Sequence, residues 1–459
     1  MTNLSGANLN NGAAVGPQGE GRESPSNFPR YPEYKDSGAE WLGEVPEGWI
    51  LARGDAYLRS QAKVVSADYL GGKEVFHYSI PVVQVTGDGQ LEDGDEIDSS
   101  KLLVEQPQVL ISKLNPRKNT VCLAGPREVV TVCSGEFVPL QSDCMDLKWV
   151  YYLVSSENFK KRLESLIESA TRSHQRVNPS DILKFRGAFP LLAEQTQIAR
   201  FLDHETARID ALIEEQQRLI ELLKEKRQAV ISHAVTKGLD PTVPMKDSGV
   251  EWLGEVPAHW KVSKFGYVST VVRGGSPRPA GDPELFNGDY SPWVTVAEVT
   301  KDDEIYLVET ETFLTKKGSD QCRVFAKGTL ILSNSGATLG VPKILEIDAN
   351  ANDGVVGFEC LTLDKEYAYF YLATMTNSLR ERIKQGSGQP NLNTDIVKSI
   401  DVPIPPAGEV HEIVASVKRI REKFKLLSEE AELGINLLKE RRSALISAAV
   451  TGKIDVRNW

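Results

Sequence analysis

Five polar segments carry the side chain types that proteins use to read the edges of DNA bases. Residues 113–119 and 171–176 lie in the first half of the chain, and residues 273–278, 333–338 and 385–391 lie in the second half. In the major groove, arginine pairs with guanine, asparagine or glutamine pairs with adenine, and serine or threonine contacts either. Lysine and arginine also contact phosphates. These segments indicate a surface that binds duplex DNA, and an ordinary polar loop is the alternative for any one of them.

The candidate DNA-binding residues are the polar side chains of these segments. They are Lys113, Asn115, Arg117, Lys118, Arg172, His174, Gln175, Arg176, Arg273, Ser276, Arg278, Ser333, Asn334, Ser335, Thr338, Gln385, Ser387, Gln389 and Asn391. The corresponding placement of such segments in the two halves makes the group a stronger signal than any single member.

Sequence motifs for catalysis or for binding cofactors and metals are not found. There is no GxxxxGK[ST] phosphate-binding loop and no glycine-rich dinucleotide-binding turn. No Asn-Pro-Pro-aromatic or Asp-Pro-Pro-aromatic tetrapeptide of an amino-methyltransferase occurs, and the six histidines form no HExxH or HxH motif. Five cysteines without CxxC spacing argue against a disulfide framework and against a zinc site. We therefore expect no catalytic residues, no cofactor and no metal in this chain.

The composition narrows the class of protein. The chain has 459 residues, of which 41% are hydrophobic, and a net charge of −11. This length predicts about three domains. The acidic balance argues against a protein that coats nucleic acid non-specifically. No apolar run long enough to span a membrane and no signal peptide is present, so we expect a cytoplasmic protein with no membrane partner.

Two segments of the sequence each occur twice. The twelve residues 35–46 (KDSGAEWLGEVP) recur 211 residues later as 246–257, with one difference. A second matching pair, 224–236 and 439–451, closes each half. Between these anchors the halves share little beyond length. The pattern indicates a tandem duplication in which the same frame performs one mechanical role on two different targets.

Each variable region is predicted to be an α+β or α/β globule of about 150 residues. The expected strands include 75–85, 109–112, 328–332 and 354–361, and the expected shorter helices are 148–170 and 367–383.

A long helix is predicted after each globule. Spacings of four and three residues, mostly apolar, run from 202 to 234 in the first half and through 413, 417, 420, 424, 427 and 431 in the second. About 40 residues correspond to about 60 Å of helix. Gly238 and Gly452 fit the two helix ends. One apolar stripe of this length needs a partner, so we expect the helices to pack antiparallel. Packing of each helix on its own globule is the alternative.

These motifs together resemble the specificity subunits of type I restriction–modification systems. The resemblance rests on the duplicated frame, on Gly-Gly-Ser-Pro at 274–277, on Pro-Leu-Leu-Ala-Glu-Gln at 190–195, and on the matching helix ends. It covers the chain from about Tyr31 to Lys453.

The resemblance implies an α/β (mixed α+β) fold. Two tandem globular target recognition domains would be joined by two long antiparallel coiled-coil helices in a pseudo-two-fold arrangement. The expected segments are a disordered N-terminal tail (1–30), target recognition domain 1 (31–190), helical spacer 1 (191–240), target recognition domain 2 (241–405) and helical spacer 2 (406–459).

The resemblance also implies a function. Each globule would read one half of a split, asymmetric duplex DNA site, and the helices would set the gap and dock methyltransferase subunits. S-adenosylmethionine would bind the methyltransferase subunits and ATP the restriction subunits that carry the motor, so this chain would be neither an enzyme nor a cofactor carrier. The alternatives are a coiled-coil scaffold that binds only protein partners, and an enzyme whose catalytic part lies elsewhere.

Overall fold

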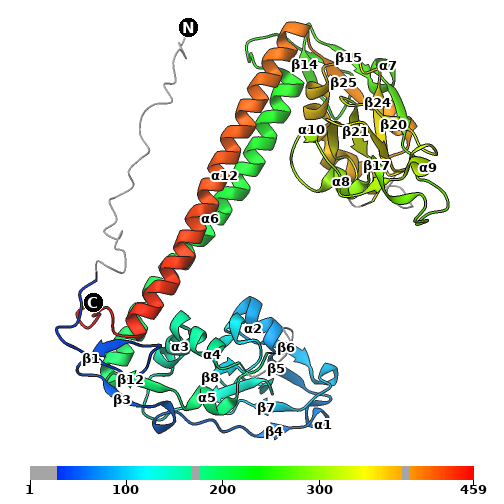
Figure 1. Cartoon of the computed structure of the whole chain (residues 1–459). Helices are drawn as coiled ribbons and strands as arrows, with labels where there is room; N and C mark the ends of the chain where they lie inside the picture. Colours follow the sequence, from blue (N-terminus) through cyan, green and yellow to red (C-terminus); the bar gives the residue numbers. More distant parts are fainter. Residues whose placement is uncertain (1–27, 168–174, 337, 385–391) are drawn as a thin grey trace, which may run out of the picture. The chain divides into compact units, whose positions relative to one another are not determined.

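The computed structural model of the chain describes residues 28–167, 175–336, 338–384 and 392–459 (Figure 1). It consists of two compact units. Unit 1 contains the chain up to Gln216 together with Leu433–Trp459, and unit 2 contains Gln217–Glu432. The boundary falls inside two long helices, so each of these helices contributes to both units. Within the described ranges, no helix has the length and apolar character needed to cross a membrane.

Unit 1 holds two sheets, a five-stranded one in the order β4-β7-β10-β5-β6 and a three-stranded one in the order β11-β8-β9. Its strands are β1 (Tyr34–Asp36), β2 (Glu44–Pro46), β3 (Ile50–Arg53), β4 (Val64–Val65), β5 (Glu74–Tyr78), β6 (Gln90–Asp93), β7 (Lys101–Leu103), β8 (Gln108–Ser112), β9 (Val121–Ala124), β10 (Val130–Ser134), β11 (Phe137–Leu140) and β12 (Arg186–Phe189). Its shorter helices are α1 (Ala67–Leu70), α2 (Ile80–Thr86), α3 (Leu147–Ser155), α4 (Glu157–Ser165) and α5 (Pro179–Leu183).

Unit 2 holds a five-stranded sheet in the order β16-β24-β21-β22-β18 and a four-stranded one in the order β19-β17-β23-β20. Its strands are β13 (Met245–Asp247), β14 (Glu255–Pro257), β15 (Lys261–Lys264), β16 (Thr270–Arg273), β17 (Phe286–Val294), β18 (Tyr306–Leu307), β19 (Phe313–Leu314), β20 (Val324–Phe325), β21 (Leu330–Ser333), β22 (Pro342–Leu345), β23 (Ala349–Ala351), β24 (Val355–Glu359) and β25 (Asp401–Ile404). Its shorter helices are α7 (Phe265–Val268), α8 (Val296–Thr300), α9 (Lys316–Ser319), α10 (Lys365–Lys384) and α11 (Thr394–Ser399). The mixed α/β fold class is confirmed.

The two long helices are α6 (Leu192–Lys237) and α12 (Ala407–Val450), with 46 and 44 residues. They pack antiparallel, as expected. In unit 1, Arg442 of α12 donates to Asp210 of α6 at 2.9 Å, and further back along α6, Gln197 donates to the backbone oxygen of the C-terminal Trp459 at 2.8 Å.

The apolar ladder of the helices faces inward with one exception. In α6, Leu202 and Ala234 are buried, and so is Ile413 in α12. Leu427 was expected in the same stripe and is instead 37% exposed, so this expectation is wrong. The half-buried residue there is Ser428, because the stripe shifts by one position at this point of α12.

Two local expectations are also wrong. The apolar run 75–85 is a strand only to Tyr78, and helix α2 follows. Pro81 lies in the first turn of α2 and has no N–H to donate to a neighbouring strand. Gly87 (φ 74°) ends this helix. The helix expected over 148–170 is two helices, because Ser156 is extended and caps the second one. Its last residues, from 168, lie outside the described residues.

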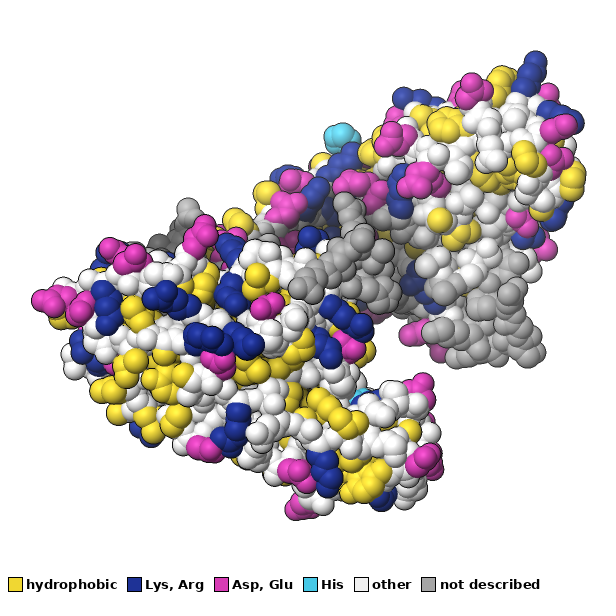
Figure 2. Space-filling view, turned by 60° about the horizontal axis from the view of Figure 1, so that its bottom comes forward, with side chains coloured by type: hydrophobic (Ala, Val, Ile, Leu, Met, Phe, Trp, Pro, Cys, Tyr) yellow, Lys and Arg dark blue, Asp and Glu magenta, His cyan; other side chains and the backbone are white. Residues whose placement is uncertain are grey.

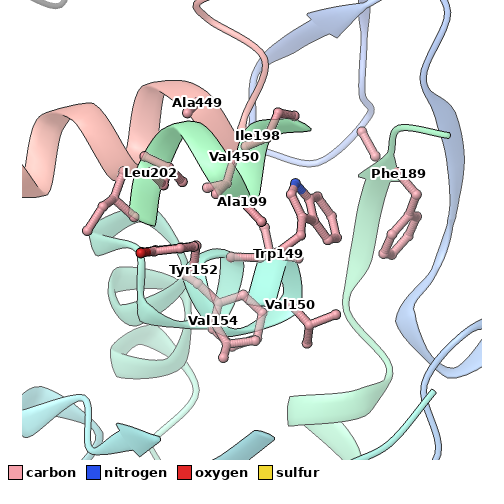
Figure 3. Packing of buried hydrophobic residues seen from close by; sticks show 14 of the residues in the cluster. Trp149, Val150, Tyr152, Val154, Phe189, Ile198, Ala199, Leu202, Ala449 and Val450 are labelled. Atoms are coloured by element: carbon pink, nitrogen blue, oxygen red, sulfur yellow. The ribbon is translucent and has the colours of Figure 1, made fainter. Parts of the chain in front are cut away.

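The core of unit 1 joins the globule to both long helices. Figure 3 shows Trp149 and Tyr152 of α3 packed near Ile198 and Leu202 of α6, with Val450 of α12 in the same cluster. All five side chains are buried. The globule and the helix ends in this unit therefore share one hydrophobic core rather than meeting across a polar interface.

An ion pair ties the globule to a long helix in each unit, with the charges reversed. In unit 1, Lys148 of α3 pairs with Asp203 of α6. In unit 2, Glu366 of α10 pairs with Lys418 of α12 at 2.6 Å. Both pairs follow an aspartate that caps the globule helix. If either globule docked on the other helix, like charges would face each other, at a small cost because both pairs are partly exposed.

The duplicated frame explains how each long helix begins. Each copy forms a short hairpin, β1 with β2 and β13 with β14, followed by a buried tryptophan. The indole N–H of Trp49 donates to Glu194 at 3.1 Å, and that of Trp260 donates to Glu409 at 2.8 Å. Both glutamates lie in the first turn of a long helix, where the helix dipole favours a carboxylate.

The same frame holds the end of the other long helix. Gly452 follows α12 at φ 72°, and a Cβ atom there would lie 2.3 Å from Pro46 of the first frame. Gly238 follows α6 at φ 78°, and a Cβ atom there would lie 3.3 Å from the ring of Trp260 in the second frame. Each frame therefore closes over one helix start and one helix end, which accounts for the repetition of both segments.

The start of the described chain packs into unit 1. The ring of Phe28 meets that of Phe201 edge-on at 5.3 Å, and the backbone N–H of Asp455 donates to the oxygen of Pro29 at 2.7 Å. Residues 28–30 were assigned to a disordered tail, and for them this expectation is wrong. The rest of the expected tail, residues 1–27, lies outside the described residues.

The glycine contact in unit 1 yields a test by matched substitution. Gly452→Ala is expected to lower the free energy of unfolding by about 1–3 kcal/mol, because the new methyl group meets the ring of Pro46 and the left-handed conformation is strained. At Gly434, inside α12, an added Cβ atom has nothing within 4 Å. Gly434→Ala is therefore expected to raise the free energy of unfolding by about 0.5–1 kcal/mol. The measurement is the urea midpoint of unit 1 unfolding. Equal shifts for the two variants would contradict the contact.

Candidate nucleic-acid interface

Two of the segments that the sequence singled out meet in unit 1. The backbone N–H of Asn115 donates to the oxygen of Gln175 at 2.8 Å, and that of Val177 donates to the oxygen of Lys113 at 3.0 Å. Leu114 and Arg176 form an isolated antiparallel bridge between these bonds. The candidate residues at 113–118 and 175–176 therefore belong to one site.

The loop after β8 is held in an uncommon conformation. Asn115 (φ 49°) and Asn119 (φ 43°) are left-handed and flank a 3₁₀ turn at Pro116–Lys118. Asparagine tolerates this region better than most residues, and such strain persists where the surroundings impose it. The side chain of Asn119 donates to the backbone oxygen of Ser155 at 2.8 Å, which fixes one end of the loop. The fixed turn presents Arg117 and Lys118, both exposed.

The cations of this site differ in how far they are engaged. Arg176 pairs with Glu136 at 2.9 Å, and Lys113 donates to the backbone oxygen of Gly135 at 2.9 Å. Lys118 lies 3.3 Å from the amide oxygen of Gln84. Arg117 has neither a hydrogen bond nor an ion pair with any described residue. Its guanidinium is thus the most available cation of the loop.

In unit 2, two predicted segments converge on a turn that the sequence did not indicate. The backbone N–H of Asn334 donates to the oxygen of Gly354 at 2.9 Å. From the other side, Ser276 donates to the Asp353 carboxylate at 2.8 Å and Arg273 Nε donates to the Asp353 backbone oxygen at 2.6 Å. The residues Asn352–Gly354 therefore form the centre of this site.

Not all candidates in unit 2 reach the surface. Ser333 and Asn334 are 0% exposed. The hydroxyl of Ser333 donates to the oxygen of Thr338 and accepts from the N–H of Val341, both at 2.9 Å, so it shapes the loop from within. Thr338 is exposed and Ser335 half-buried. Arg278 is exposed too, and its backbone N–H is held by a side-chain amide.

Several candidates lie outside the described residues. They are Arg172, His174, Gln385, Ser387, Gln389 and Asn391. Conversely, sequence reasoning missed Glu136 and the turn with Asp353. The available signal was a glycine beside an acidic residue just before a strand, Gly135-Glu136 in one half and Asp353-Gly354 in the other.

The two units build this junction with the same backbone bonds. In each, the loop after a buried strand (β8 or β21) bonds to the turn before the neighbouring strand and to the segment before a short helix. The bonds are Lys113 N to Glu136 O and Val177 N to Lys113 O in unit 1, and Asn334 N to Gly354 O and Leu392 N to Asn334 O in unit 2. Two residues further along, Asn115 and Gly336 are both left-handed. The backbone is shared although the side chains differ.

The charges on the molecular surface are mixed. Figure 2 shows lysine and arginine side chains interspersed with acidic and apolar ones on the visible face, rather than merged into one basic surface. A mixed surface of this kind favours selective contacts over non-specific attraction to phosphates.

The long helices carry exposed leucines at repeated positions. Leu212 and Leu437 are 40% and 57% exposed in unit 1, and Leu427 and Leu222 are 37% and 51% exposed in unit 2. The repeat relates Leu212 to Leu427 and Leu222 to Leu437. A contiguous exposed apolar patch marks a surface that binds other proteins, whereas single exposed leucines are common on any protein.

Metal ligands and thiols do not gather at the candidate sites. Among the described residues, no group of three or more His, Cys, Asp or Glu side chains is placed to hold a metal ion. The five cysteines are free thiols, and burial raises the pKa of Cys122 and of Cys133 to about 12.

Comparison with known sequences gives a consistent family. Residues 257–433 match the type I restriction modification DNA specificity domain. The specificity subunit of the type I restriction enzyme EcoKI from Escherichia coli is 23% identical over 452 residues, which covers 90% of this chain and 91% of that protein. The MjaIX specificity subunit from Methanocaldococcus jannaschii is 29% identical over 166 residues, 35% of this chain and 38% of that protein.

Solved structures share the fold. A chain from a study of complex assembly and conformational transition of the type I R-M system superposes with a TM-score of 0.64 at 17% identity, and covers 88% of this chain and 98% of its own length. The HsdS subunit from Thermoanaerobacter tengcongensis superposes with a TM-score of 0.52 at 16% identity over 89% of this chain and 98% of its own.

Proposed function

We propose that this chain, which belongs to the specificity subunits of type I restriction–modification systems, supplies the DNA address for the methyltransferase and restriction subunits of such a complex. Each unit reads one half of a split duplex site. The observation that carries the proposal is the junction built with the same backbone bonds in both units and different side chains. A shared scaffold with different contacts suits two different half-sites.

The chemistry of the two junctions supports an asymmetric site. Unit 1 offers mainly cations, Lys113, Arg117 and Lys118, and unit 2 offers Arg273 with the hydroxyl of Thr338. Arginine discriminates guanine by a bidentate contact, whereas a hydroxyl is a less selective partner. The two halves of the site are therefore expected to differ in sequence.

The long helices suit the role of a spacer. A helix of 46 residues is about 69 Å long. Half-sites that lie on one face of a duplex are separated by about 34–36 Å per helical turn. The helices are long enough to carry two reading surfaces at such a separation, and we propose that their length sets the gap.

The repeated leucines support docking of two copies of one partner. Leu212 and Leu427 occupy equivalent positions in the sequence repeat and both are exposed, so each unit offers the partner an equivalent apolar contact. We assign these sites to methyltransferase subunits. S-adenosylmethionine would be bound by those subunits and ATP by the restriction and motor subunits, so this chain would contribute no catalytic group.

The direct test is modified-base sequencing of DNA from cells that express this chain with its neighbouring methyltransferase subunit. We expect methyladenine in one split motif, and only when this chain is present. The control is the same cells without the chain. If both proteins associate and no new methylation appears, the alternative of a scaffold that binds only protein replaces the proposal.

Shortening both helices tests the spacer. We expect that removal of seven residues from 206–230 of α6, with the matching heptad from α12, keeps the apolar ladder in register and shortens the rod by about 10 Å. The methylated motif should then lose about three base pairs from its gap and keep both half-sites. An unchanged gap would refute a ruler role for the helices.

A substitution of Arg117 tests the reading surface of unit 1. Arg117→Ala is expected to weaken binding of a duplex with the full site about tenfold, because one contact of about 1–3 kcal/mol is lost. Arg53→Ala, an exposed arginine already paired with Asp55, is the matched control and should bind as the parent does. The readout is fluorescence anisotropy of the purified complex with its methyltransferase subunits. Equal affinities of the parent and Arg117→Ala would remove this loop from the interface.

A further inference from the structure

We infer that Asp353 determines specificity in unit 2, where its carboxylate accepts a hydrogen bond from the amino group of a cytosine in the half-site. The inference rests on the proposed function, since it requires that unit 2 faces DNA bases.

Asp353 lies where the two described loops of the candidate site meet. Its backbone oxygen accepts from Arg273 Nε at 2.6 Å, and one carboxylate oxygen accepts from the Ser276 hydroxyl at 2.8 Å. Next to it, Gly354 receives the N–H of Asn334. The side chain is therefore held by one loop, while its own turn supports the other.

The second carboxylate oxygen is available. Asp353 is exposed, and no described residue donates to this oxygen or forms an ion pair with the carboxylate. Arg273 donates its Nε–H to the backbone oxygen of Asp353 and forms no ion pair with the carboxylate, so the negative charge of Asp353 is not neutralised by a described residue. A carboxylate on a DNA-facing surface is repelled by phosphates. Cytosine and adenine both present an amino donor in the major groove, and adenine places its N7 acceptor beside that donor. The carboxylate therefore favours the cytosine amino group, which donates to Asp or Glu.

The equivalent turn of unit 1 shows the contrast. There Glu136 is paired with Arg176 at 2.9 Å, so its charge is engaged within the protein. Backbone bonds of the same kind hold both turns, and a carboxylate is thus not needed as a free group to form the turn. The second oxygen of Glu136 also lacks a donor among the described residues, but it is buried. Asp353 is exposed and forms no ion pair with a described residue, so its free oxygen is open to a ligand.

The neighbouring arginine extends the inference to the base pair. The terminal nitrogens of Arg273 have no partner among the described residues, and arginine pairs with guanine O6 and N7. The amino group of a cytosine and these acceptors of its paired guanine lie on one major-groove edge. Asp353 and Arg273 together match a C·G pair.

The test is Asp353→Asn, measured with the complex of this chain and its methyltransferase subunits. The readouts are the methylated motif and relative affinities for duplexes that carry each of the four base pairs at each half-site position. The amide keeps an oxygen for Ser276 and replaces the free acceptor by a donor. We expect one position in one half-site to lose its preference for cytosine by at least about tenfold, with adenine or guanine tolerated there. The other half-site should stay unchanged.

Two further variants separate base reading from loop support. Ser276→Ala removes the internal bond and keeps the carboxylate, so it is expected to weaken methylation without changing which base is preferred. Glu251→Gln makes the same change from carboxylate to amide in a turn of the frame, and should leave the motif as it is. If Asp353→Asn binds no duplex, Asp353→Ser, which also removes the carboxylate, is measured in its place.

The outcomes are distinguishable. A parent complex that methylates no split motif refutes the proposed function itself. A parent motif without a C·G pair in either half, or an unchanged base preference in the Asp353 variants, overturns the assignment of Asp353 and leaves the proposed function intact. An identical response of Ser276→Ala and Asp353→Asn, without a change in base identity, makes Asp353 a loop support only.

Discussion

In each unit, the same hydrogen bond joins the duplicated frame to the start of a long helix. The indole N–H of Trp49 or Trp260 donates to a glutamate in the first turn of a long helix. The same tryptophan lies against the glycine that ends the antiparallel partner helix. A hydrogen bond from a buried tryptophan, flanked by a close glycine approach, tolerates little change, because substitution would leave the indole N–H without its acceptor or create a clash. The frame around it is accordingly almost identical in the two halves.

Because the frame holds the ends of the long helices, the rest of each globule can vary in sequence and in strand order. Strands β3 and β12 in unit 1, and β15 and β25 in unit 2, pair next to the frame and bring both ends of the variable region together. Between these strands the sheets differ in strand order and number. What both units retain is the junction of loop, turn and pre-helix segment, which is made of backbone bonds and is therefore indifferent to most side chains. This arrangement separates the stability of the unit from the identity of its contacts.

The sequence predicted the parts of the structure that are periodic or repeated. The ladder of α6 and the duplicated frame are of this kind, since helical spacing and near-identity are visible without knowledge of long-range contacts. The strand prediction for 75–85 failed because a proline in the apolar run favours a helix start over a strand, and α2 forms there. The prediction for Leu427 also failed, because a shift of one residue in a helical stripe depends on packing in three dimensions.

The candidate site was predicted only in outline. Polar composition found the loops around Asn115 and Ser335, yet it could not tell that Ser333 and Asn334 are buried, because loop residues that cap their own backbone have the same composition as exposed ones. The turn at Asp353 was missed since its role comes from two loops that are more than fifteen residues away in the sequence. Long-range convergence of this kind is not written in any local pattern.

We propose that each frame carries one independent DNA-reading surface. The most direct measurement replaces residues 54–185, between β3 and β12, by the corresponding region of another specificity subunit. The methylated motif is then sequenced. We expect a new sequence on one side of the gap, with the gap and the other half-site unchanged. New sequences on both sides of the gap would contradict it.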